Sequence, residues 1–157
     1  MIFEKLLFGG DRNQIRLTTA ASAGIAFGIA GGTLRAWCYR ELGKHFTFQM
    51  SVMKDHRLVT TGPYRIVRHP SYTGVIMTSA SIVLLHATRG SWVRESGLLR
   101  YLPGKIGAAI FAFVIAFIPP ALFLRMKTED RAMRKRFGDE WDAWAARVCY
   151  MIIPGIL

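Results

Sequence analysis

Two charged residues in the last third of the chain, Arg125 and Glu129, have the type and spacing of a small recognition site. Their separation of four positions places them on one face of a helix. An arginine presents a fork of donors that matches a carboxylate, and a glutamate accepts hydrogen bonds from an amine or a ribose. The pair therefore indicates a ligand clamp. The alternative is a surface ion pair that would stabilise the helix by roughly a few tenths of a kcal/mol.

A second polar group lies in residues 62–74, GPYRIVRHPSYTG, which lead directly into the uncharged run VIMTSASIVLL. Gly62 and Pro63 predict a turn there. The arginines and His69 supply hydrogen-bond donors, and His56 lies upstream among other polar residues. A lone histidine is more often structural than functional, so spacing alone gives neither histidine a role. Irregular polar backbone beside an apolar segment is tolerated where it lines a cavity.

Several kinds of site are not indicated. The sequence has no glycine-rich phosphate loop and no Cys/His cluster with metal-ligand spacing, so no metal site is predicted. Cys38 and Cys149 are far apart and predict no disulfide framework. The formal net charge of +11 is compatible with nucleic-acid binding, but no aromatic-basic RNA-binding motif accompanies it, so we expect no nucleic-acid partner.

The elements that must position these residues are apolar helices. Three stretches carry no charged residue, namely 18 residues after Arg16, 20 after Arg68 and 19 after Lys105. A bilayer-spanning helix needs about 20 largely apolar residues. We therefore predict an all-α integral membrane protein with spans near residues 17–34, 70–88 and 106–124, forming one domain over residues 1–157. The alternative is a soluble protein with three buried helices.

The basic residues indicate how such a protein would be oriented. With three spans, residues 35–69 and 125–157 share one side of the membrane and hold fourteen of the Lys and Arg residues, whereas the other side holds seven. Cytosolic loops carry the excess of Lys and Arg. We therefore expect residues 35–69 and a charged C-terminal helix in the cytosol, close to a lipid bilayer whose anionic headgroups attract them.

Glycines and prolines predict further details. Gly24, Gly28 and Gly32 recur every four residues and predict a face on which another helix packs closely. A helix continuing past Arg35 should end at Gly43. Gly138 should divide the C-terminal helix into two pieces, and Pro119-Pro120 should kink the third span.

Several blocks together resemble the isoprenylcysteine carboxyl methyltransferase family. LVTTGPYRIVRHPSYTG is followed, after a hydrophobic hairpin, by RMKTEDRAMRKRFGDEWDAWAARVCYMIIPGI. The family pairs a Gly-x-Tyr…Arg-His-Pro-Ser-Tyr-x-Gly block with an Arg-x-x-x-Glu-Glu…Phe-Gly-x-Glu-Tyr…Val…Ile-Pro block. The upstream segment RAWCYRELGKHFTF is similar as well, so the resemblance covers residues 34–156.

The resemblance implies a cofactor and site residues. The family binds S-adenosylmethionine without a Rossmann fold. Arg125 would hold the substrate carboxylate and act as the catalytic residue. Most residues that would bind the cofactor come before or at the start of the second span, namely Gln49, His56, Arg57, Leu58, Val59, Tyr64, His69, Pro70, Ser71 and Tyr72. Glu129 would bind the cofactor as well.

The implied reaction is methylation of the C-terminal carboxylate of a prenylated cysteine during the processing of CaaX proteins, in the endoplasmic reticulum membrane, with the active site facing the cytosol. Two alternatives are a phospholipid N-methyltransferase, which must remove a proton from its amine nucleophile, and a truncated, non-catalytic membrane scaffold. A homo-oligomer could supply missing walls of the cleft.

The sequence departs from the family pattern in three ways. The acidic pair is Glu129-Asp130 rather than Glu-Glu, and Trp141 replaces a tyrosine. Family members usually have five or more spans, so a chain with three is expected to be truncated or minimal, with the missing helices before residue 17.

Overall fold

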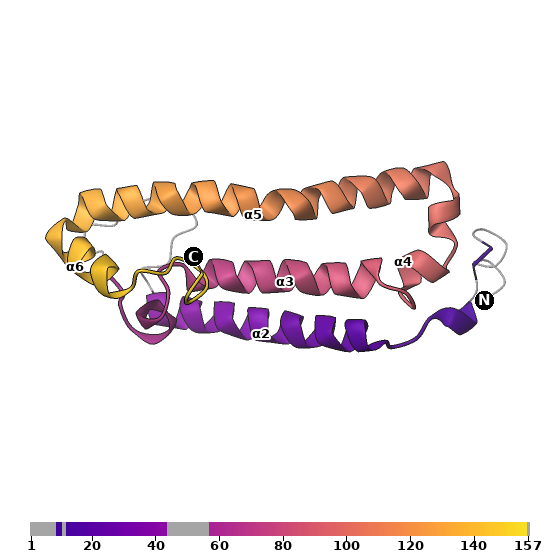
Figure 1. Ribbon diagram of the computed structural model, residues 1–157, viewed down its shortest axis with the longest axis horizontal. Helices are drawn as coiled ribbons and strands as arrows, with labels where there is room; N and C mark the ends of the chain where they lie inside the picture. Colours follow the sequence, from indigo (N-terminus) through magenta and orange to yellow (C-terminus); the bar gives the residue numbers. More distant parts are fainter. Residues whose placement is uncertain (1–8, 11, 44–56, 157) are drawn as a thin grey trace. The chain divides into compact units, whose positions relative to one another are not determined.

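The computed structural model describes residues 9–10, 12–43 and 57–156. Every regular element in these ranges is helical, which confirms the all-α prediction. The order is η1 (Arg12–Gln14), α2 (Thr19–Leu42), η3 (Gly62–Arg65), α3 (Pro70–Ala87), α4 (Trp92–Glu95), η4 (Leu98–Arg100), α5 (Leu102–Phe137) and α6 (Asp139–Arg147) (Figure 1). The predicted cofactor residues Gln49 and His56 lie outside the described residues.

Among the described helices, α5 alone is long and apolar enough to cross a membrane. It has 36 residues and contains the third predicted span. None of its most apolar 18-residue window is buried within the protein, and Leu102 and Phe113 are exposed. Such a surface is suited to contact with lipid. The first two predicted spans overlap α2 and α3, and the count of three spans stays a prediction.

Contacts divide the chain into two compact units, Met1–Ala30 with Met77–Ile118, and Gly31–Ile76 with Pro119–Leu157. The boundaries fall within α2, α3 and α5, and the boundary in α5 lies directly before the Pro119-Pro120 pair. All candidate site residues that the structure describes belong to the second unit.

In the first unit, small residues allow α2 to approach α3. A Cβ added to Gly24 would lie 3.0 Å from Leu84 Cβ, and one added to Gly28 would lie 2.8 Å from Ser81 Oγ. The predicted glycine face is confirmed at these two positions. It is wrong at Gly32, where a Cβ would meet nothing within 4 Å. A helix has 3.6 residues per turn, so a four-residue repeat drifts by about 40° at each step.

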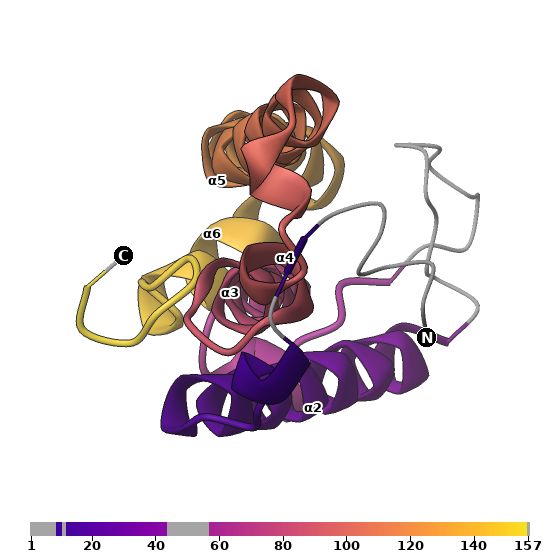
Figure 2. The same cartoon turned by 90° about the vertical axis from the view of Figure 1, so that its right-hand side faces the viewer.

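The connection from α3 to α5 contains two short helices, α4 and η4. Figure 1 and Figure 2 both place α4 at the C-terminal end of α3, where it leads through η4 into α5. Ser91 caps α4 by accepting a hydrogen bond from Arg94 N, and Gly97 provides the left-handed turn before η4 with φ 82°.

The second unit has a small apolar core formed by Cys38, Tyr64, Trp144 and Val148. Glycines shape the chain around it as predicted. The α2 helix ends at Leu42 before Gly43, and Gly62 has φ 56° at the turn into η3. Gly138, with φ 53°, separates α5 from α6.

Substitutions of two glycines should have opposite effects on stability. A Cβ on Gly74 would lie 2.8 Å from the Gly31 carbonyl oxygen and 2.6 Å from Arg35 Cγ, both in α2. We expect Gly74→Ala to lower the free energy of unfolding by about 1–3 kcal/mol. Gly32→Ala, in open space, should leave it unchanged or raise it by about 0.5–1 kcal/mol. Thermal unfolding in detergent, monitored by circular dichroism, measures the change in the free energy of unfolding for both variants. Equal effects would contradict this packing.

The two cysteines should differ in reactivity. Cys38 is fully buried, whereas Cys149 is exposed. Burial raises the pKa of the Cys38 thiol to about 11, so the reactive thiolate is scarce at neutral pH. We expect N-ethylmaleimide to modify Cys149 at least about 100-fold faster than Cys38 at pH 7.5. Mass spectrometry of digests measures both rates, and Cys149→Ser provides the matched control. Similar rates would contradict the burial of Cys38.

Candidate active site

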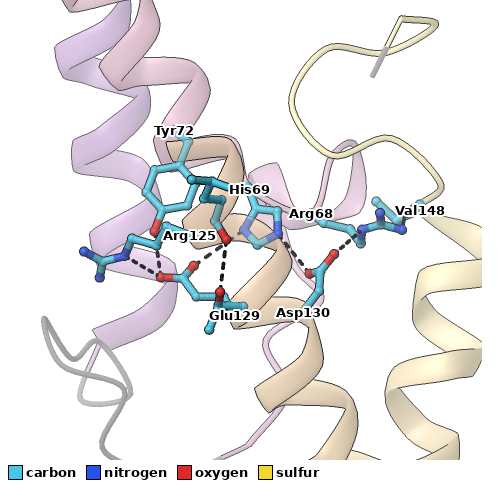
Figure 3. A network of polar contacts seen from close by, with 9 residues as sticks. Arg68, His69, Tyr72, Arg125, Glu129, Asp130 and Val148 are labelled. Atoms are coloured by element: carbon cyan, nitrogen blue, oxygen red, sulfur yellow. Dashed lines mark hydrogen bonds and ion pairs between the residues drawn. The ribbon is translucent and has the colours of Figure 1, made fainter. Parts of the chain in front are cut away.

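The candidate site lies where the start of α3 meets α5 in the second unit (Figure 3). His69 and Tyr72 come from the beginning of α3, and Arg125, Glu129 and Asp130 come from α5. The structure thus brings together residues of two sequence blocks that are about sixty positions apart.

Glu129 is the centre of the predicted clamp. Arg125 Nε donates to Glu129 Oε1 over 2.8 Å, as the four-residue spacing predicts. Tyr72 Oη donates to the same oxygen over 2.6 Å, so the pair is tied to α3 and is more than a local helix contact. The Arg125 side chain is 50% exposed and that of Glu129 is 24% exposed. A ligand arriving from solvent would therefore meet the guanidinium first.

The other oxygen of Glu129 is held loosely. Glu129 Oε2 lies 3.7 Å from His69 Nδ1, which exceeds the length of a good hydrogen bond. The His69 ring stacks on Tyr72, with centroids 5.6 Å apart, so its position is fixed from the side. This oxygen is therefore the acceptor in the clamp that could most readily bind a cationic group.

Asp130 extends the network beyond the residues that the sequence predicted. His69 Nε2 and Asp130 Oδ1 are 2.9 Å apart, and Asp130 Oδ2 lies 3.4 Å from Arg68 Nε. The family pattern marks Asp130 only as a departure, and no sequence pattern assigns Arg68 an individual role. The one sequence feature that could have indicated their role is that Arg68 directly precedes His69 and Asp130 directly follows Glu129. The network therefore holds two carboxylates and two guanidinium groups around His69.

The C-terminal segment fixes the polar segment before α3. Arg68 N donates to the Tyr150 carbonyl oxygen over 2.9 Å, and His69 N donates to that of Met151 over 2.8 Å. Thr73 Oγ1 donates to the Ile152 carbonyl oxygen over 2.8 Å. These bonds position His69 and Tyr72 from a segment some eighty residues further along the chain, which no local pattern indicated.

The remaining predicted cofactor residues occupy different surroundings. Leu58, Val59 and Tyr64 belong to the apolar core or pack against it. Burial raises the pKa of the Tyr64 hydroxyl well above its ordinary value, so Tyr64 stays neutral. Pro70 is fully buried as the first residue of α3, Ser71 is half-buried, and Arg57 is exposed. The structure thus joins His69, Tyr72, Arg125 and Glu129 in one network and places Leu58, Val59 and Tyr64 in the adjacent core.

The arrangement is suited to hold charged groups and offers little for covalent catalysis. Carboxylates of Glu129 and Asp130 attract cations, and the guanidinium groups of Arg125 and Arg68 attract carboxylates. The apolar side chains around Tyr64 offer contact area to an uncharged planar group. The donor and acceptor set therefore fits a ligand with separate cationic, anionic and apolar parts, which is the chemical character of S-adenosylmethionine.

Comparison with known proteins agrees with the sequence resemblance. Residues 24–95 match the model of the isoprenylcysteine carboxyl methyltransferase (ICMT) family. This range includes His69 and Tyr72 but ends before Arg125 and Glu129.

Two curated proteins are similar over most of the chain. Protein-S-isoprenylcysteine O-methyltransferase B of Arabidopsis thaliana is 28% identical over 128 residues, which are 80% of this chain and 55% of that protein. A Delta(14)-sterol reductase of Neurospora crassa is 26% identical over 129 residues, which are 72% of this chain and 26% of that protein. The chain thus spans about half the length of the first relative and a quarter of the second. The two names describe different reactions, so the residues of the site must distinguish them.

Proposed function

We propose that this chain, which belongs to the isoprenylcysteine carboxyl methyltransferase family, transfers a methyl group from S-adenosylmethionine to the C-terminal carboxylate of a prenylated cysteine. The observation that carries the proposal is the Arg125–Glu129 pair, which is tied to Tyr72 and lies beside His69. The pair places a carboxylate-binding group next to a cation-binding group.

The proposed reaction requires the protein to bind the methyl donor and the acceptor carboxylate and to orient them. When bound, S-adenosylmethionine would supply an electrophilic methyl group, whose S–CH₃ bond would break as the O–CH₃ bond forms, with no proton transferred. A terminal carboxylate has an ordinary pKa of roughly 3.3–3.7 and is ionised at neutral pH, so no general base is needed. Arg125 would hold this carboxylate and remove it from water, and Glu129 would bind the cationic part of the methyl donor.

Other residues would complete the cofactor site. Leu58, Val59 and Tyr64 would provide its apolar wall, and His69, Ser71 and Tyr72 would form its polar side. Pro70, buried at the first position of α3, would hold the backbone of this side in place. Gln49, His56 and Arg57 are proposed to contribute from the segment before η3.

The apolar surface of α5 would hold the chain in a membrane. With three spans, the excess of Lys and Arg would place the site on the cytosolic side, and the family resemblance implies the endoplasmic reticulum. Burial of the prenyl chain of the acceptor would contribute about 0.8 kcal/mol per CH₂. A homo-oligomer is proposed to contribute walls of the lipid-binding cleft.

The test is transfer of labelled methyl from S-adenosylmethionine to N-acetyl-farnesylcysteine by the detergent-solubilised chain. The expected product is a methyl ester, so the label should be released by mild base. The rate should be nearly constant from pH 6 to pH 8, because the nucleophile is already ionised over that range.

Two outcomes would favour the alternatives. Base-stable label in phospholipid, with a rate that rises with pH, would indicate an N-methyltransferase. Absence of both transfer and cofactor binding would indicate a non-catalytic scaffold. Either outcome would overturn the carboxyl methyltransferase proposal.

A further inference from the structure

Arg68 is a largely buried cation whose contacts are poor. Its side chain is 16% exposed, and its Nε atom is buried without a hydrogen-bond partner in the described part of the chain. Its contacts there are long, 3.4 Å from Nε to Asp130 Oδ2 and 3.5 Å from Nη1 to the Val148 carbonyl oxygen. A well-made charged N–H···O bond measures about 2.7–2.9 Å. The guanidinium therefore has the capacity to bind a further oxygen ligand.

A second unsatisfied donor lies next to this group. The Arg68 guanidinium carbon lies 6.0 Å from the centre of the Trp141 ring. The Trp141 indole nitrogen is also buried and has no hydrogen-bond partner among the described residues. A buried donor without an acceptor costs about 1–3 kcal/mol. Two such donors on neighbouring side chains, one of them cationic, match the needs of a carboxylate.

The proposed reaction brings two carboxylates to the site, that of the acceptor and that of the amino-acid end of the methyl donor. The network has one guanidinium at each end, with Glu129, His69 and Asp130 between Arg125 and Arg68 (Figure 3). The ends differ in access, because Arg125 is 50% exposed and Arg68 is 16% exposed. A protein terminus needs the accessible end, which leaves the enclosed end to the smaller substrate.

We propose that Arg68, assisted by the Trp141 N–H, binds the carboxylate of the methyl donor's amino-acid end, while Glu129 Oε2 accepts from its ammonium group. This inference rests on the proposed function and deepens it, because it divides the two arginines between the two substrates. Arg68 is in contact with Asp130, and Glu129 lies on the other side of His69, so the network offers a cation for the carboxylate and an anion for the ammonium group.

The test compares two ligands on the detergent-solubilised full chain by calorimetry. S-adenosylhomocysteine carries the amino-acid end, and 5′-methylthioadenosine lacks it. Arg68→Gln should weaken binding of S-adenosylhomocysteine by about 10- to 100-fold and change that of methylthioadenosine by less than about twofold. Trp141→Phe should weaken only S-adenosylhomocysteine, by about fivefold. Arg65→Gln, which changes an exposed arginine three positions earlier, should change neither affinity.

The outcomes separate this inference from the proposed function. If the unaltered chain binds neither ligand, both the inference and the proposed function fail. If it binds S-adenosylhomocysteine and Arg68→Gln binds it equally well, the inference alone is overturned. Equal weakening of both ligands would show a structural role, and a raised KM for the acceptor with unchanged cofactor affinity would assign Arg68 to the acceptor. Arg68→Lys, which keeps the charge beside Asp130, replaces Arg68→Gln if that variant does not fold, and should weaken S-adenosylhomocysteine selectively.

Discussion

An Arg125→Ala variant should methylate N-acetyl-farnesylcysteine with a kcat/KM that is lower by about 100-fold, while its affinity for S-adenosylhomocysteine changes by less than about threefold. The reason is that Arg125 is the more exposed cation of the network and would bind the acceptor carboxylate in the ground state and the transition state. Initial rates of labelled methyl transfer measure kcat/KM, and calorimetry measures cofactor affinity.

The matched control for this prediction is Arg131→Ala. Arg131 is an exposed arginine on α5, outside the network around Glu129. Its loss changes the net charge by the same amount and should leave kcat/KM within about twofold. Equal losses in the two variants would mean that general surface charge, rather than a contact with the acceptor, supports the reaction.

The second large effect is expected for Glu129→Gln, which replaces a charged acceptor by a neutral side chain of nearly the same shape. Glu129 would bind the cationic part of the methyl donor, and it also accepts from Tyr72 and Arg125. We expect affinity for S-adenosylmethionine to fall by about 100-fold and methyl transfer at subsaturating cofactor to fall in proportion.

The cofactor dependence distinguishes this effect from the loss of Arg125. A high concentration of S-adenosylmethionine should restore much of the rate in Glu129→Gln but not in Arg125→Ala. Glu140→Gln, at an exposed position in the first turn of α6, is the control and should bind cofactor normally. An unchanged cofactor affinity in Glu129→Gln would remove Glu129 from the cofactor site.

The features that depend on local physics could be predicted from the amino-acid sequence alone. Helix content followed from long uncharged runs, and the apolar third run became α5. Glycines with positive φ at Gly43, Gly62 and Gly138 marked the turns, because these backbone conformations are strained for other residues. The Arg125–Glu129 contact followed from the four-residue helical repeat.

Which distant residues meet could not be predicted in this way, because it depends on how the helices pack. The contacts of Asp130 with His69 and Arg68, and the binding of the polar segment to the C-terminal residues, join positions about 60 to 80 residues apart, a separation at which helical periodicity carries no information. The same limit explains Gly32, which shares the spacing of Gly24 and Gly28 but meets no neighbour. Local spacing places a residue on a face of its helix, whereas packing selects the partner of that face. Packing of α3 and α5 brings Arg68 and Asp130 into the network around Glu129.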